Sequence, residues 1–140
     1  MQADVFHLAY PIKDKEDTRL FYRDILGCSV GREAKNWIDF NFFGHQLSFH
    51  IRPDAFTGPS VTNDVDGKKV PVRHFGAVLD WQDWHVLRDR LVEFNIEFVI
   101  KPYIRFKGET GEQATMFFLD PSGNALEFKS FKDRSQIFAP

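Results

Sequence analysis

The sequence predicts an α+β fold built from two βαβββ modules, and three observations lead to this prediction. Two distant tetrads read alike, Phe6-His7-Leu8-Ala9 and Arg73-His74-Phe75-Gly76. Each is followed first by apolar residues at helical spacing and then by short segments typical of strands. A third stretch, Ala125-Leu126-Glu127-Phe128, places a carboxylate inside an otherwise apolar strand pattern.

The first module is predicted at about residues 3–52. A strand that contains His7 opens it, and the spacing of apolar residues then predicts a helix over 17–27 that ends at a glycine. Two extended segments follow, at 37–43 and 46–52. This order of elements is half of the predicted fold.

The second module, at about residues 72–130, repeats the order. A strand begins near His74, and a helix is predicted over 82–95. Extended segments follow the helix at 97–100, 114–119 and 125–130. Four apolar side chains would share one face of the helix: Trp84, Leu87, Leu91 and Phe94.

The two modules differ in length. His7 and His74 are 67 residues apart, whereas Ser48 and Glu127, which match at the last strand, are 79 apart. The second half therefore carries 12 extra residues, which we assign to the charged, glycine-containing stretch 101–112. The stretch 53–71 reads as the linker between modules, and 131–140 as a C-terminal tail.

Composition indicates one domain, 1–140, that acts on small molecules. A chain of 140 residues with 43% apolar content can bury a core. A net charge of −2 and the absence of a basic run argue against nucleic acid or a membrane surface as partners. Cys28 is the only cysteine, so we expect no internal disulfide, a cytoplasmic location and a packed rather than nucleophilic thiol.

The alternation of side chains along strands predicts which residues could form a metal site. His7 would share its face with Ala9, and His74 would share its face with Gly76, while Glu127 sits in the last strand of the second module. The opposite faces carry large apolar residues that suit packing against the helices: Phe6, Leu8, Phe75, Leu126 and Phe128. The pattern predicts a curved sheet with helices outside and a partly polar hollow inside.

Two imidazoles and one carboxylate form a ligand set for a divalent first-row metal. Three protein ligands leave positions for water and substrate, as in catalytic rather than structural sites. The alternative is that His7 and His74 are hydrogen-bonded core residues and that Glu127 pairs with Lys129. The repeat-matched trio favours the metal.

The chain resembles the vicinal oxygen chelate superfamily, which includes glyoxalases, fosfomycin- and bleomycin-resistance proteins and extradiol dioxygenases. The resemblance covers nearly the whole chain, and residues 21–27 and 120–127 (Asp-Pro-Ser-Gly-Asn-Ala-Leu-Glu) carry its most specific signals. It implies a cupped eight-stranded mixed sheet with helices outside. It also implies a metal held by His7, His74 and Glu127, with Fe(II) expected first and Mn(II), Ni(II) or Zn(II) next.

The departures from the superfamily's patterns bear on the reaction. Glyoxalase I enzymes use a fourth ligand, a carboxylate, where this chain has Ser48. Extradiol dioxygenases use a histidine base that aligns with His45, and a tyrosine that aligns with Phe117. Since phenylalanine cannot hydrogen-bond a substrate oxygen, ring cleavage gains only partial support. The alternative for His45 is that it lies in a hairpin turn, exposed to solvent, and has no role in the reaction.

Two alternatives stay open. Fosfomycin-resistance proteins match the length and the ligand set, and here Lys101, Arg105 and Lys107 could anchor an anionic substrate or form a lid. Bleomycin-resistance proteins bind drugs without metal chemistry but generally lack the complete trio. Ser48 and Phe117 are further candidates for substrate contact, and His50 is a weak site candidate because it shares the face of Ser48.

The sequence thus predicts a cytoplasmic, metal-dependent enzyme that acts on a small oxygenated substrate, with extradiol-type dioxygenase chemistry first. Lyase, isomerase or transferase chemistry is the alternative, and small-molecule binding is the second alternative. A homodimer is expected from the resemblance alone.

Overall fold

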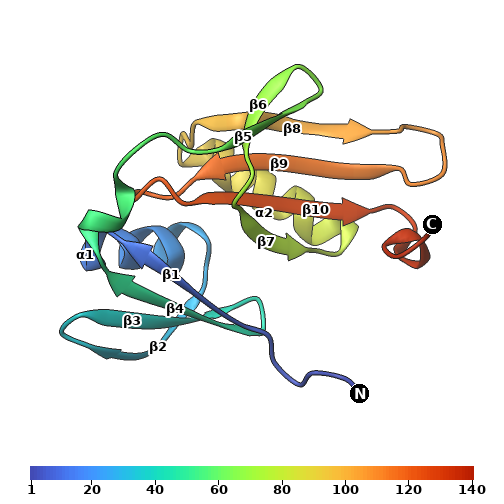
Figure 1. Cartoon of the computed structure of the whole chain (residues 1–140). Helices are drawn as coiled ribbons and strands as arrows, with labels where there is room; N and C mark the ends of the chain where they lie inside the picture. Colours follow the sequence, from blue (N-terminus) through green and yellow to red (C-terminus); the bar gives the residue numbers. More distant parts are fainter. The chain divides into compact units, whose positions relative to one another are not determined.

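The computed structural model describes residues 1–140, which form two compact units. The first consists of residues 1–59 and 120–124, and the second of 60–119 and 125–140. Each unit contains a mixed four-stranded sheet, and the second also contains a two-stranded hairpin (Figure 1). The α+β class and the βαβββ modules are confirmed.

The sheet of the first unit has the order β1-β4-β3-β2. Its strands are β1 (His7–Ile12), β2 (Ser29–Ala34), β3 (Trp37–Phe42) and β4 (His45–Ile51). β1 runs parallel to β4, and the other pairs are antiparallel. Strand β2 was not predicted, because its side chains are mostly exposed and show no apolar alternation.

The predicted first helix is present and has an irregular geometry. α1 (Lys15–Arg19) begins after Asp14, whose carboxylate accepts a hydrogen bond from Asp17 N at 2.8 Å. It continues into the π-helical turn η1 (Leu20–Ile25), which buries Tyr22. The Tyr22 ring packs against Phe49 and Phe40, with centroids 4.7 and 5.4 Å apart. An aromatic core therefore lies between this helix and the sheet.

The Asp-Pro-Ser-Gly-Asn turn at 120–124 also belongs to the first unit. The buried Tyr22 hydroxyl donates to Asp120 Oδ2 at 2.9 Å, Lys13 N donates to Ser122 Oγ at 2.8 Å, and Asn124 Nδ2 donates to Pro11 O at 2.9 Å. Burial raises the pKa of the Asp120 carboxyl. The turn that carries the family signal is thus held to β1 and to the first helix by hydrogen bonds.

The sheet of the second unit has the order β7-β10-β9-β8. Its strands are β7 (Phe75–Val78), β8 (Phe98–Arg105), β9 (Gln113–Leu119) and β10 (Ala125–Phe131), and the helix is α2 (Trp81–Glu93). The Trp84 indole donates to the Phe128 carbonyl at 2.9 Å, so α2 packs against this sheet. Leu87 and Leu91 are buried as predicted. The prediction for Phe94 is wrong: it caps the helix end and is 48% exposed.

The predicted linker 53–71 contains regular structure. A 3-10 turn, η2 (Pro53–Phe56), is followed by a hairpin of β5 (Thr62–Val65) and β6 (Lys68–Pro71). Asp66 and Gly67 form its tight turn, both with positive φ. Val65 and Val70 pack with core residues of the sheet: Ile100, Phe117 and Ala125. The hairpin therefore covers part of the sheet face that was expected to be open.

Further expectations need correction. Strand β8 extends to Arg105, so only the second half of the predicted insertion 101–112 is loop, and η3 (Arg134–Gln136) forms a short turn in the tail. Phe6 does not pack against a helix but is 59% exposed, because it precedes β1. Cys28 is buried, and burial raises its pKa to about 12, as expected of a packed thiol. None of the helices has the length and apolar character needed to cross a membrane.

Candidate metal centre

The second unit brings His74 and Glu127 into direct contact. His74 lies one residue before β7 rather than within a strand, and Glu127 lies in β10. The His74 Nε2 atom is 3.2 Å from Glu127 Oε2. Two of the three predicted metal ligands therefore lie together.

The hydrogen bonding of His74 fixes which ring nitrogen faces Glu127. Its other ring nitrogen, Nδ1, is 3.0 Å from the carbonyl oxygen of Pro71. Since a carbonyl only accepts, Nδ1 carries the hydrogen, and in neutral imidazole Nε2 is then an acceptor that faces a carboxylate oxygen. A metal ion or a second ring proton makes such a contact favourable. Donation of the remote N–H to a backbone carbonyl is also the usual support of a metal-ligating histidine.

The carboxylate of Glu127 is held on its other oxygen. The Thr115 hydroxyl donates to Oε1 at 2.9 Å, while Lys129 Nζ lies 3.7 Å from the same oxygen. The expected alternative pairing with Lys129 is thus present but longer than the contact with His74. One carboxylate oxygen is oriented by Thr115, and the other is directed at the imidazole.

Gly76 allows the strands to approach closely beside this pair. It lies directly opposite Glu127 in the parallel pairing of β7 and β10. A Cβ atom at Gly76 would lie 1.6 Å from the Glu127 carbonyl oxygen. The two ligands line a shallow cavity of about 180 Å³ together with Lys129 and residues 75–78.

His7 belongs to the first unit and lies at the start of β1, where it is exposed and its imidazole has no hydrogen-bond partner. In the sheet register His7 lies beside Gln46, Ala9 beside Ser48, and Ser48 beside Asp39. Adjacent residues in register point to the same face, so these polar side chains share a face. Asp39 and Ser48 are both 8% exposed, and Gln46 Nε2 donates to Asp39 Oδ2 at 3.4 Å.

His45 and His50 fall on different faces of β4. His45 is the first strand residue, because the hairpin turn consists of Phe43 and Gly44, both with positive φ. Its Nδ1 accepts the backbone N–H of Phe6 at 3.0 Å. By alternation His45 shares its face with buried Leu47 and not with His7, whereas His50 shares the face of Ser48 and is exposed. The role of base for His45 stays a prediction.

The other predicted contact residues all lie in the second unit. Phe117 is buried in β9 with its ring against His74, at a centroid distance of 5.1 Å. Lys101 and Arg105 lie in β8, and Lys107 lies in the loop that follows. Arg105 Nε is 3.2 Å from Asp66 Oδ2 in the hairpin turn.

Several polar residues of this region were missed by sequence reasoning. Thr115 follows from alternation, because it pairs with Lys129 in register and lies next to Glu127 on the same face. The positions of Asp66 and Tyr103 cannot be derived from alternation, because the hairpin was not predicted and β8 has a register shift between Ile100 and Tyr103. The Asp66-Gly67 pair between Val65 and Val70 is the signal that could have revealed the hairpin.

No group of three or more His, Cys, Asp or Glu side chains that could hold a metal ion forms in the structure. The donor set of His74 and Glu127 nevertheless fits a divalent ion, for the hydrogen-bonding reasons given above. The protein therefore combines two βαβββ modules with an imidazole and a carboxylate in direct contact.

The comparisons with known proteins identify the family. The sequence model of the Glyoxalase/Bleomycin resistance protein/Dioxygenase superfamily matches residues 5–128, and the chain belongs to this superfamily. Members of it generally depend on a divalent metal. The comparison with curated proteins gave no match.

Solved structures agree with this assignment. The chain is 32% identical to a glyoxalase/bleomycin resistance protein/dioxygenase from Alicyclobacillus acidocaldarius, with 96% of each chain covered and a TM-score of 0.80. It resembles the fosfomycin resistance protein FosX from Listeria monocytogenes at 13% identity, covering 98% of this chain and 100% of that one, with a TM-score of 0.71. A lactoylglutathione lyase from Agrobacterium tumefaciens is 12% identical over 99% and 98% of the chains, with a TM-score of 0.65. The last two likenesses show the fold alone.

Proposed function

We propose that this protein is a divalent-metal-dependent enzyme that binds a small substrate through two of its oxygen atoms. The observation that supports this most is the contact of His74 Nε2 with Glu127 Oε2 at 3.2 Å, with the other imidazole nitrogen engaged by Pro71 O. His7 is the proposed third ligand. Ser48 would not ligate, because a neutral hydroxyl is a poor donor to such an ion.

The chain's own residues prepare the site for this chemistry. When bound, the metal would supply Lewis acidity, which stabilises negative charge on substrate oxygens. Pro71 fixes the orientation of His74, and Thr115 fixes that of Glu127. Phe117, packed on the His74 ring, excludes water from one side of the imidazole. These contacts keep the two ligands in place before any substrate arrives.

Extradiol-type ring cleavage is the first candidate reaction. Two histidines and one carboxylate suit Fe(II) and leave positions for a catechol and dioxygen, with His45 as the proposed base. The second candidate is addition or lyase chemistry with Mn(II), Ni(II) or Zn(II). Two observations favour the second candidate: Phe117 offers no hydroxyl, and His45 lies on the opposite face of β4 from Ser48.

Metal binding is the first test. The protein, purified without a histidine tag, is stripped with chelator and titrated with each of the four metals by calorimetry and elemental analysis. We expect about one metal per chain, and more than about 100-fold weaker binding for His74→Ala and Glu127→Gln. The control His85→Gln removes an imidazole that bonds only within α2 and should leave affinity unchanged. Equal affinity in all variants would refute the proposed ligands.

The reaction is tested on anaerobically Fe(II)-loaded protein, to which catechols and then oxygen are added. A yellow ring-opened product supports ring cleavage. No product across several catechols, with metal bound, supports the second candidate. Failure to bind any metal after reloading would favour a binding protein without metal chemistry.

Assembly and location are also proposals. The resemblance to small members of the superfamily supports a homodimer, and the single, buried Cys28 is consistent with a cytoplasmic protein. Sedimentation velocity at several concentrations distinguishes a dimer from a monomer.

A further inference from the structure

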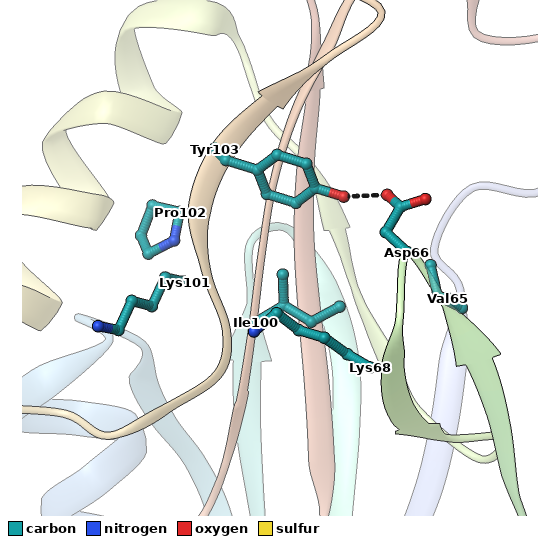
Figure 2. A pocket seen from close by; sticks show the side chains of 7 residues that line it. All are labelled: Val65, Asp66, Lys68, Ile100, Lys101, Pro102 and Tyr103. Atoms are coloured by element: carbon teal, nitrogen blue, oxygen red, sulfur yellow. Dashed lines mark hydrogen bonds between the residues drawn. The ribbon is translucent and has the colours of Figure 1, made fainter.

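A second, larger cavity lies between strand β8 and the β5–β6 hairpin. It has a volume of about 260 Å³. Its lining residues come from these two elements alone: Val65, Asp66, Lys68, Ile100, Lys101, Pro102 and Tyr103 (Figure 2). Nothing in the proposed metal chemistry uses it.

This cavity lies on the sheet face that bears the proposed ligand pair. Ile100 is paired with Phe117 across β8 and β9, and Phe117 with Glu127 across β9 and β10. The Phe117 ring in turn contacts His74. The cavity and the ligand pair therefore lie on one face of the sheet, and a molecule that reaches from one to the other must displace the buried side chains of Phe117 and Ile100 between them.

The lining is apolar in its body and positively charged at its edge. Val65, Ile100, Pro102 and the Tyr103 ring supply the apolar part. The one carboxylate, Asp66, is already engaged, because the Tyr103 hydroxyl donates to it and Arg105 forms an ion pair with it at 3.2 Å. An incoming group therefore meets no free negative charge.

Lys68 and Lys101 are the two cations of the lining, and Lys68 is the one that lies in the hairpin. Val65 and Lys68 face each other across the hairpin, so Lys68 shares the side of the hairpin that packs toward the sheet. It has no ion-pair partner. Figure 2 draws Lys68, Ile100 and Tyr103 on one side of the β8 ribbon and Lys101 on the other. Lys68 is thus the lining cation on the side of β8 that carries Ile100 and Tyr103.

We propose that this cavity binds the distal end of the substrate, and that this end is an apolar group carrying a carboxylate that pairs with Lys68. The inference rests on the proposed function, because it assumes a substrate whose other end binds metal near His74 and Glu127. The substrate is then a small amphipathic acid with two oxygens at its reactive end. The Tyr103–Asp66–Arg105 contacts hold the hairpin in the position that forms the cavity.

The test uses metal-free protein in chelator, so that a carboxylate cannot bind through a metal. The probes are 3-phenylpropanoate and its neutral match, 3-phenylpropanamide, titrated by calorimetry and by ¹H–¹⁵N NMR. We expect the acid to bind at least about tenfold more tightly than the amide, as a charge-assisted hydrogen bond implies. Amide shifts should concentrate at Val65, Lys68, Ile100 and Tyr103.

Lys68→Met should abolish the preference for the acid while leaving binding of the amide unchanged. Lys69→Met is the matched control, because it removes the same charge from the same strand but from the opposite face of the hairpin. Equal affinity for acid and amide in the natural protein, or an unchanged preference in Lys68→Met, would overturn the inference. So would shifts confined to residues outside the cavity.

The two proposals fail independently. Probe binding that depends on Lys68, in a protein that binds no metal, would sustain the cavity and refute the metal chemistry. Metal binding that depends on His74, without selective binding of the acid, would support the metal site and refute the role of the cavity.

Discussion

At the scale of single residues, Gly76 shows how a small side chain can be needed for the backbone rather than for the ligand. The sequence places Gly76 on the same strand face as His74, beside the predicted hollow. The structure gives a reason for the glycine, since its Cα faces the Glu127 carbonyl oxygen so closely that no Cβ fits. The position of a proposed metal ligand therefore depends on the absence of one methyl group.

We predict that Gly76→Ala destabilises the protein by about 3 kcal/mol or more, because β7 and β10 must separate to admit the methyl group. Urea denaturation measures the change. Gly31→Ala is the control: a Cβ there would meet its nearest atom at 3.4 Å, an ordinary contact. Equal stability of the two variants would contradict this account of the strand approach.

At the scale of elements, helix α1 is tied to strand β2 by ion pairs. Arg19 Nη2 lies 2.6 Å and Lys15 Nζ 3.3 Å from Glu33 Oε2. The hydrogen bond from Arg19, followed by that from Lys15, lowers the pKa of Glu33 from 4.5 to about 2. These contacts hold an edge strand that has no buried side chain of its own.

The lowered pKa predicts a pH dependence. Because the folded-state value lies below the unfolded one, the stabilisation from Glu33 is complete above about pH 4.5 and is lost as pH falls toward 2. Glu33→Gln should therefore unfold more easily than the natural protein near neutral pH, and the difference should shrink below pH 4.5. Thermal unfolding from pH 7 to 2.5 measures it. Glu97→Gln, which lacks an ion pair, should show no such convergence.

At the scale of the whole molecule, the turn at 120–124 is assigned to a different unit from the strands that flank it. This turn connects β9 to β10 of the second unit but belongs to the first. Tyr22, 98 residues away in sequence, donates to Asp120 within it. The 120–124 turn is recognisable from its own sequence, but its hydrogen bond with Tyr22 cannot be predicted from any local pattern.

Tyr22→Phe should destabilise the protein by about 1–3 kcal/mol, because the buried Asp120 carboxyl loses a hydrogen-bond donor. It should also raise the pKa of Asp120 further, since that bond opposes the effect of burial. Chemical denaturation and NMR titration of the carboxyl measure the two effects. Tyr103→Phe, whose hydroxyl bonds an exposed carboxylate, should cost less stability.

Much of the fold was predictable because its signals are local. Helical spacing located α1 and α2, and apolar alternation located β3, β4, β9 and β10. The same alternation, with the repeat, selected His74 and Glu127, which the structure brings within 3.2 Å of each other. Strand β2 and the β5–β6 hairpin escaped because their exposed side chains carry no apolar periodicity.

The sequence by itself determined the two modules, their helices and the residues selected as metal ligands, since a period of two or of 3.6 residues is a property of consecutive side chains. Only the tertiary structure decided that a hairpin covers the second sheet and that β8 shifts register to bring Tyr103 to Asp66. It also decided that the 120–124 turn joins the first unit. These features arise from contacts between segments far apart in the chain, which local periodicity does not encode.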